Sequence, residues 1–274
     1  MKNNNNKIEK KLRREAFSKN WKLFKQSRLG MVGLYIVFFF FISPTLADTL
    51  NQERKFNIYA KLSLVPKIKI MEISTLLNVE NESFHYEFII NSKNIVEFIN
   101  QIDGKGKVEG FVNNLYQPTK YTYKYIRKKK EKYVEIDYDN NKVVKVTNIP
   151  EFDNSKLSAV TNEMLVDTID PSSFFLNVLD FNKIGGCKNK FKIFDGKRRY
   201  DVVFNNLIIN QDKGTIECEA EQIRLGGYKK NEKVGDVFAA SDYIKIIYKN
   251  DELNSFVGYE AKNGSIKIII NEAL

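Results

Sequence analysis

The sequence predicts a mainly β (α+β) protein, built as one highly curved antiparallel sheet with two short helices packed on its concave face. Three observations support this fold class. Apolar and polar residues alternate with a period of two along most of the chain after residue 80, and turn-forming residues separate the alternating runs. Two short segments carry apolar residues at helical spacing instead. Ten or more strands with two helices are typical of a sheet that covers its apolar face with the helices.

The first strands are predicted from alternation around two turns. Residues 84–90 place Phe and Ile on one face and polar residues on the other. Residues 121–125 and 134–138 alternate in the same way and flank a charged turn at 127–131, which predicts a hairpin with a basic tip. Asn140-Asn141 supplies the next turn, because asparagine tolerates a positive φ. A further strand over 142–146 completes an antiparallel meander.

Strands resume in the last third of the chain. Asp195-Gly196 and Asn263-Gly264 are residue pairs typical of hairpin turns. The runs that alternate around these turns predict strands over residues 191–194, 200–204, 207–210, 215–220, 243–248 and 265–270.

Two segments predict short helices. Ser92 is suited to cap a helix whose apolar face would carry Ile95, Val96, Phe98, Ile99 and Ile102, with Gly104 and Gly106 ending it. The second helix begins at Asp170-Pro171, an N-cap followed by proline at the first helical position, and runs to Leu179. Both helices are too short to be stable alone, so they are expected to pack on the sheet.

Residues 1–47 have the pattern of an export signal. Ten Lys and Arg residues precede an uncharged run that starts at Gly30, and Ser-Pro-Thr-Leu-Ala47 then supplies small residues for cleavage. Cleavage after Ala47 would leave residues 48–274 as a single domain in the periplasm. The alternative is an uncleaved inner-membrane anchor with a periplasmic domain, because residues 30–46 are uncharged and just long enough to span a bilayer. In both cases the N-terminal segment contacts the membrane during export.

The charge distribution argues against a nucleic-acid partner. The chain carries 44 Lys and Arg against 34 Asp and Glu, a net charge of +10, but residues 1–47 account for eight of those ten charges. Residues 48–274 keep 34 basic and 32 acidic side chains. A nearly balanced domain lacks the basic surface that phosphate contacts require.

Several short motifs, taken in chain order, resemble a known family. They are Asn57-Ile-Tyr-Ala60, residues 134–138, Asp170-Pro171-Ser-Ser-Phe174, the run Phe194-Asp-Gly-Lys-Arg-Arg-Tyr-Asp201 with Cys187 and Cys218 on either side, and Gly226-Gly-Tyr228. Together they are similar to domain-of-unknown-function family 3108, and the resemblance spans nearly all of residues 54–270. It implies an exported bacterial envelope protein whose fold is similar to the lipoprotein carriers LolA and LolB, an incomplete barrel around an apolar cavity. The family has no established activity, so no catalytic residue is implied.

Cys187 and Cys218 are the two cysteines of the chain, and both lie in the exported part. An oxidising compartment favours a disulfide between them over two buried thiols, and the family resemblance implies the same pair. Two thiols and a distant His85 do not make a zinc site, so no metal or cofactor is expected.

No catalytic residues are predicted. His85, the only histidine, alternates with Phe84 and Tyr86 and is therefore expected on a solvated strand face. A serine or cysteine triad has no support, and Glu135 with Asp137 is better explained as surface charge than as an acid pair. Gly185-Gly186 and Gly226-Gly227 lack the residues that would complete a phosphate-binding loop.

Two sets of residues are candidate binding sites. The first is an aromatic wall for an apolar pocket, for which ordinary core packing is the alternative explanation. Its members are Tyr121, Tyr123, Tyr125, Phe98, Phe174 and Phe175. The second is the hairpin tip with Lys197, Arg198 and Arg199, which is expected either to be solvated or to contact an anionic head group or a partner. The basic tip at 127–132 is expected to be solvated.

The sequence therefore favours a non-enzymatic envelope protein that binds an apolar or lipid-like ligand inside a curved sheet. Two other classes stay open: an envelope scaffold or protein-interaction module, and an enzyme of unrecognised type. Ligand, partner and oligomeric state are not encoded in any motif.

Overall fold

The computed structural model describes residues 49–62, 66–94, 101–127, 129–229, 243–263 and 266–273. The described strands form one 14-stranded sheet within a compact unit, Thr49–Leu274. The proposed export signal lies outside the described residues. No helix among the described residues is long and apolar enough to cross a bilayer.

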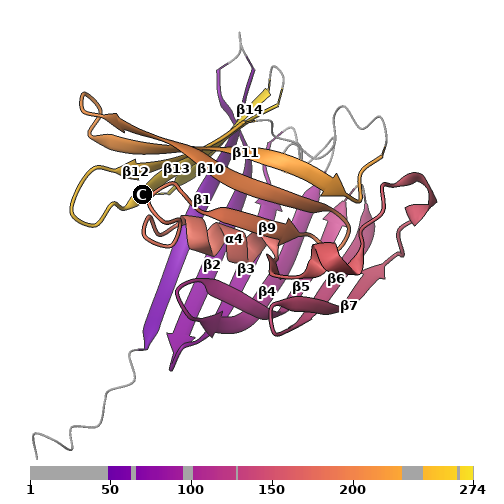
Figure 1. The fold of residues 1–274 in the computed structure, drawn as a ribbon. Helices are drawn as coiled ribbons and strands as arrows, with labels where there is room; N and C mark the ends of the chain where they lie inside the picture. The colour runs from indigo at the N-terminus through magenta and orange to yellow at the C-terminus, as the bar shows by residue number, and fades with distance from the viewer. Residues whose placement is uncertain are drawn as a thin grey trace, which may run out of the picture. The chain divides into compact units, whose positions relative to one another are not determined.

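The sheet is a meander in which every strand except β7 is paired with the strand that follows it in sequence, and β14 is paired with β1 (Figure 1). The first seven strands are β1 (Leu50–Leu62), β2 (Ile68–Glu80), β3 (Ser83–Ser92), β4 (Ile102–Val112), β5 (Tyr116–Arg127), β6 (Lys130–Asp139) and β7 (Lys142–Ile149). The other seven are β8 (Thr168–Ile169), β9 (Lys190–Phe194), β10 (Arg199–Asn210), β11 (Thr215–Gly226), β12 (Tyr243–Lys249), β13 (Phe256–Asn263) and β14 (Ile266–Glu272).

The first and last strands lie side by side in the middle of the sheet. β1 pairs antiparallel with both β2 and β14, so the two arms of the sheet extend from this junction. The backbone N–H of Ala273 donates to the carbonyl oxygen of Lys55 over 2.8 Å. β7 and β8 are consequently the two outer strands.

The two outer strands nearly close the sheet into a barrel. An isolated antiparallel bridge joins Lys142 at the start of β7 to Val166, just before β8. The Asn148 side chain of β7 also donates to the carbonyl oxygen of Gly196 over 3.0 Å. The predicted incomplete barrel is therefore confirmed, with one departure: the two-residue β8 pairs parallel with β9.

The predicted turns are present where the structure describes them. Asn140 and Asn141 have φ of 48° and 61°, as expected for the hairpin turn between β6 and β7. Gly196 has φ of 88° in the β9–β10 turn, where the Asp195 amide donates to the Arg198 carbonyl. The two strands predicted over 200–204 and 207–210 are one strand, β10, with a register shift between Phe204 and Asn206. Residues 264 and 265 lie outside the description.

One predicted helix is present and its N-cap is as expected. α4 (Pro171–Val178) begins after Asp170, whose carboxylate accepts from the backbone amides of Ser172 and Ser173. Phe175 packs edge-to-face on Phe56 of β1, with ring centroids 5.1 Å apart, so the helix lies against the inner face of the sheet (Figure 1). Two short 3₁₀ helices, η1 (Asn154–Lys156) and η2 (Asn162–Leu165), precede it.

The other predicted helix falls mostly on residues 95–100, outside the described chain. Its expected end is wrong, because Ile102, Gly104 and Gly106 belong to β4. The two glycines alternate with Lys105 and Lys107, and the residues between the exposed lysines point inward. Because glycine normally weakens a strand, Gly104 and Gly106 were interpreted as the end of the preceding helix and not as part of a strand.

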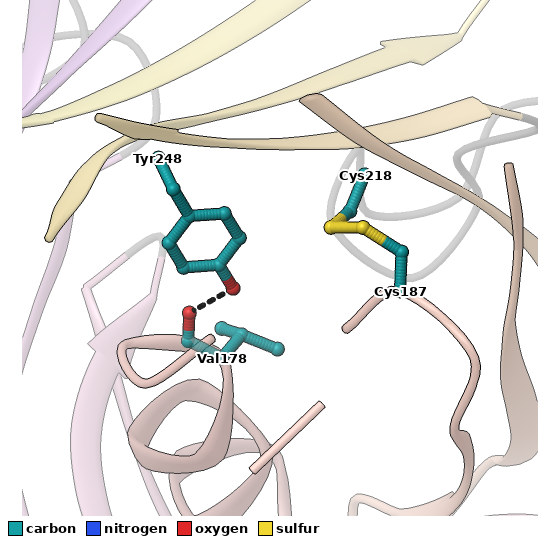
Figure 2. Close-up of a disulfide and its surroundings, with 4 residues drawn as sticks. All are labelled: Val178, Cys187, Cys218 and Tyr248. Atoms are coloured by element: carbon teal, nitrogen blue, oxygen red, sulfur yellow. Dashed lines mark hydrogen bonds between the residues drawn. A yellow bond between two sulfur atoms is a disulfide. The ribbon is translucent and has the colours of Figure 1, made fainter. Parts of the chain in front are cut away.

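The described chain has a disulfide between Cys187 and Cys218 with Cα atoms 5.2 Å apart, which confirms the predicted pairing (Figure 2). It ties the segment after α4 to β11. Nearby, the Tyr248 hydroxyl of β12 donates to the Val178 carbonyl at the end of α4 over 2.6 Å (Figure 2). Both links are buried and fix the helix end against the sheet.

Candidate functional site

A cavity of about 360 Å³ opens on the concave face, between the inner side of β1–β6 and β14, the first turn of α4, the β9–β10 turn and the start of β10. Most of its lining is aliphatic or aromatic, and the volume falls in the range of about 300–1,000 Å³ typical of small-molecule sites. The aliphatic part comprises Ile58, Met71, Ile73, Ile90, Ile102, Val134 and Ile270. The aromatic part comprises Tyr86, Phe88, Tyr121, Tyr123, Tyr125, Phe175 and Tyr200.

Glycines on β4 let the aromatic rings lie close to the sheet. A Cβ atom at Gly104 would be 2.7 Å from Cε2 of Tyr123, and one at Gly106 would be 2.3 Å from Cζ of Phe88. Real Cβ contacts are longer, so these rings need glycine beneath them. Tyr123 also stacks on Tyr125, with centroids 4.6 Å apart and planes 13° from parallel. The close approach of these rings to β4 helps to leave space above them.

The first turn of α4 forms another wall of the cavity, through Pro171, Ser172 and Phe175. Asp170 lies directly before it, fully buried, with its carboxylate accepting from two backbone amides and from the Ser173 hydroxyl. Burial raises the pKa of Asp170 to about 6 in spite of these hydrogen bonds. Asp170 caps the helix and is not part of the cavity lining.

In the part of the chain that the structure describes, three charged residues line the cavity: Arg127 at the end of β5, and Asp195 and Arg198 in the β9–β10 turn. Asp195 accepts from the backbone amides of Lys197 and Arg198, and its carboxylate lies 3.8 Å from Nη1 of Arg198. Burial raises the pKa of Tyr121 and of Tyr200 well above the ordinary value, so their rings stay neutral. Among the described lining residues, the charged groups are therefore two guanidinium groups and one carboxylate.

The predicted aromatic wall is divided between cavity and core. Tyr121, Tyr123, Tyr125 and Phe175 line the cavity. Phe174 does not: it is buried in the core and packs edge-to-face on Phe191, with centroids 5.4 Å apart. Phe98 lies outside the described residues. Whether the four lining residues bind a ligand stays a prediction.

The predicted basic tip is divided in a similar way. Lys197 lies over the Phe152 ring, with Nζ 5.2 Å from the centroid, while Arg198 lines the cavity. Arg199 is 3% exposed and pairs with Asp201 over 2.6 Å, so it contacts neither solvent nor cavity. The pairing follows from β10, which places residues 199 and 201 on one side of the strand.

The sequence interpretation missed Arg127. It assigned this residue to a solvated hairpin tip, whereas the structure keeps it in β5 and on the cavity lining. The signal was present, because Arg127 continues the period-two series of Tyr121, Tyr123 and Tyr125. A charged residue at the end of an aromatic row was read as the start of the turn.

The outer face of β3–β7 carries the residues considered for acid–base chemistry. His85 lies 3.1 Å from Glu87 and 3.7 Å from Glu109, on the face opposite Phe84 and Tyr86. The Tyr133 hydroxyl donates to Glu135 and lowers the pKa of that carboxylate. Glu135 thus stays charged at neutral pH and does not provide a general acid. Within the described ranges, no cluster of three His, Cys, Asp or Glu side chains could hold a metal ion.

The fold and the site together define an incomplete antiparallel β-barrel with an apolar cavity on its concave face. Residues 55–270 match the model of the family described as Protein of unknown function (DUF3108), and the chain belongs to this family. This membership confirms the resemblance seen in the sequence motifs.

Among solved structures, the chain is similar to the crystal structure of a β-barrel-like protein of domain of unknown function DUF1849 from Brucella abortus. The TM-score is 0.45 and the sequence identity 8%, over 83% of this chain and 97% of that one. Comparison with curated proteins gives no match.

Proposed function

We propose that this protein is exported to the bacterial periplasm and binds an apolar or lipid-like ligand in the cavity, without catalysing a reaction. The cavity itself is the observation that carries the proposal. It is lined mainly by aliphatic and aromatic side chains, and transfer of apolar ligand surface from water into such a lining is favourable.

The charged groups in and beside the cavity support binding over catalysis. Asp170, whose pKa is raised, is a single carboxylate engaged as the cap of α4. An acid–base pair would need a second titratable group within reach of a bound substrate. The cavity offers Asp195 in that role, but two backbone amides already bind its carboxylate.

A scaffold function through the β9–β10 turn has less support. Arg199 is buried in an ion pair, and Arg198 faces the cavity. Lys197 is the one of these three cations that is neither fully buried nor part of the described cavity lining, and its side chain lies over the Phe152 ring.

The proposal is tested with phenylnaphthylamine, a neutral fluorophore that brightens in apolar sites, added to the full chain. Ile90→Trp places a large ring on the cavity lining, and we expect it to weaken binding about tenfold or more, a loss of about 1.4 kcal/mol. Ile89→Trp is the matched control, because Ile89 is the neighbouring residue of β3, 43% exposed on the outer face. Equal fluorophore binding by the wild type and Ile90→Trp would contradict the proposal.

A further inference from the structure

Two tyrosine hydroxyl groups in the cavity have no hydrogen-bond partner among the described residues. Tyr121 of β5 is 6% exposed and Tyr200 of β10 is 7% exposed, and both line the cavity. No hydrogen bond joins either hydroxyl to another residue of the described chain. Tyr86, which also lines the cavity, differs because its hydroxyl bonds to Thr75. Buried hydroxyl groups normally have a partner, so these two are donors that the described chain leaves unused.

The two hydroxyl groups are open to the cavity and are not sealed in the core. Tyr138 shows the contrast, because its hydroxyl is enclosed by the protein, has no partner in the described chain and is absent from the cavity lining. The hydroxyl groups of Tyr121 and Tyr200 are not enclosed in this way. Since these two side chains are otherwise buried and line the cavity, the cavity is the space into which their hydroxyl groups open.

The two tyrosines lie on one side of the cavity. Tyr121 is opposite Ile136 in the β5–β6 ladder, and a Cβ atom at Gly196 would be 3.8 Å from Cδ1 of Ile136. The β9–β10 turn therefore lies beside this part of β5 and β6, and Tyr200 is the second residue of β10, directly after the turn. The carboxylate of Asp195 in the turn raises the pKa of both tyrosines, as expected of a charge that lies near both rings.

A purely hydrocarbon ligand would leave both donors unsatisfied. A ligand that fills the cavity displaces water from the hydroxyl groups, and a buried donor without a partner weakens the complex. Burial raises the pKa of both phenols well above the ordinary value, so both keep the proton that they can donate. A carbonyl oxygen has two lone pairs and no hydrogen, so it can accept from both phenols.

The charges near the two hydroxyl groups favour an uncharged ligand. After the larger effect of burial, Asp170 and Asp195 both raise the pKa of Tyr121. At Tyr200 the effect of Asp195 is larger than the opposite effect of Arg198. A carboxylate or phosphate bound at these hydroxyl groups would be repelled by the same negative charges, whereas a ketone or an ester accepts the hydrogen bonds without bringing a charge.

We infer that the ligand is an uncharged molecule with the carbonyl group of an ester or a ketone, whose oxygen accepts hydrogen bonds from Tyr121 and Tyr200 while its apolar part lies against the rest of the lining. The inference rests on the proposed function, because it assigns a chemical class to the ligand of the same cavity. The test therefore separates the contact with the carbonyl group from binding in the cavity.

The carbonyl contact is tested with butyrophenone and butylbenzene, which share one skeleton and differ by a carbonyl in place of a methylene group. Each compound is used to displace phenylnaphthylamine from the full chain. We expect Tyr121→Phe and, separately, Tyr200→Phe to weaken butyrophenone binding about fivefold, as the loss of one neutral hydrogen bond does. Both variants should bind butylbenzene as the wild type does, because it has no hydrogen bond to lose.

Tyr138→Phe is the matched control, since it removes a buried phenol hydroxyl that does not line the cavity. It should bind both compounds as tightly as the wild type. Fluorophore binding shows that each variant is folded.

The uncharged class is tested with methyl dodecanoate and dodecanoate, an ester and the anion of its acid. We expect the ester to displace the fluorophore from the wild type at a concentration at least about tenfold lower, because the anion brings a carboxylate close to Asp170 and Asp195. Equal or tighter binding of dodecanoate would overturn the uncharged class.

The outcomes distinguish the two proposals. If the wild type binds the fluorophore but both tyrosine variants keep wild-type affinity for butyrophenone, the carbonyl contact is wrong and the apolar site stands. An equal loss of butyrophenone and butylbenzene would likewise overturn the contact, because the tyrosines would then shape the cavity without donating to the ligand. If the wild type does not bind the fluorophore at all, the proposed function fails and this inference fails with it.

Discussion

The two halves of the interior are built from the same alternating strands but are filled differently. The compact half, enclosed by β9–β14, β1 and α4, is closed by edge-to-face aromatic contacts such as Phe174 with Phe191 and Tyr248 with Phe256. The hollow half, on the inner face of β2–β6, contributes most of the described cavity lining, and Ile58, Tyr200 and Ile270 of the compact half contribute the rest of its strand residues. Alternation therefore determines which side chains point inward, while their size and the segments laid over them determine whether space remains.

The segments that cover the sheet explain much of the difference. In the compact half, α4 and the segment after it lie over the strands, and the disulfide fixes them to β11. In the hollow half, Gly104 and Gly106 remove two inward side chains from the middle of β4. α4 forms the boundary, because Phe175 lines the cavity while Phe174 belongs to the compact core.

Truncating one aromatic ring in each half should give the largest contrast in stability. Phe191→Ala opens a void in a filled core, and we expect the free energy of unfolding to fall by about 3–5 kcal/mol. Tyr123→Ala enlarges a space that already exists, so a loss of about 1–2 kcal/mol is expected. Urea denaturation of both variants measures the contrast, and equal losses would show that the halves are packed alike.

Removing the disulfide should have an effect of similar size. Cys187 and Cys218 are 31 residues apart, and the chain-entropy model gives about 3–4 kcal/mol for closing a loop of this length. The double variant Cys187→Ala with Cys218→Ala should lose that amount in urea denaturation and keep fluorophore binding. Loss of binding in a variant that is still folded would mean that the hollow half depends on this link.

The sequence predicted the strands, turns and disulfide that depend on local patterns. Asn140-Asn141 and Asp195-Gly196 specify turns through backbone conformation, and the two cysteines specify a pair through the compartment. β1 and β2 were not assigned, and β4 was taken for the end of a helix at Gly104. The function of these glycines depends on Tyr123 and Phe88, which adjacent strands bring to them, so no local pattern reveals it.

The candidate site was predictable in part for the same reason. The period of two placed Tyr121, Tyr123 and Tyr125 on one face, and the structure confirms that they share the cavity lining. The sequence pattern could not distinguish Phe174 from Phe175, because only the tertiary position of α4 decides which ring faces the cavity. The inward direction of Arg198 likewise depends on contact between the β9–β10 turn and Val134.

The boundary between the halves should respond to pH through Asp170. Its pKa rises from 3.8 to about 6 on folding, so the folded protein holds this proton more tightly than the unfolded chain. The contribution of Asp170 to stability is therefore greatest below pH 3.8 and falls as the pH rises to about 6, by about 3 kcal/mol. Asp170→Asn keeps a capping oxygen without a charge and should lack this loss.

Unfolding free energies of the wild type and Asp170→Asn, measured at several pH values, isolate this group, because all other titrating side chains are common to both proteins. The unfolding free energy of Asp170→Asn relative to that of the wild type should increase steadily as the pH rises from 3.8 to about 6. A difference in unfolding free energy that does not change with pH would show that burial does not raise the pKa of Asp170.

A modest change in stability is expected from adding one methyl group to the hollow half. A Cβ atom at Gly104 would meet Tyr123, so Gly104→Ala should push this ring into the cavity at a cost of about 1–3 kcal/mol. Fluorophore binding should weaken, whereas Lys105→Ala on the exposed face of β4 should leave binding unchanged. Unchanged binding by Gly104→Ala would show that the glycines do not maintain the cavity.

The central claim is that the hollow half holds a ligand, and non-denaturing mass spectrometry of the full chain after export in a bacterium tests it most directly. We expect the wild type to carry an extra non-covalent mass and Ile90→Trp to carry none, and we expect the polypeptide to begin at Asp48 if the signal is cleaved. A wild-type protein with no added mass, or the same added mass on Ile90→Trp, would contradict the account.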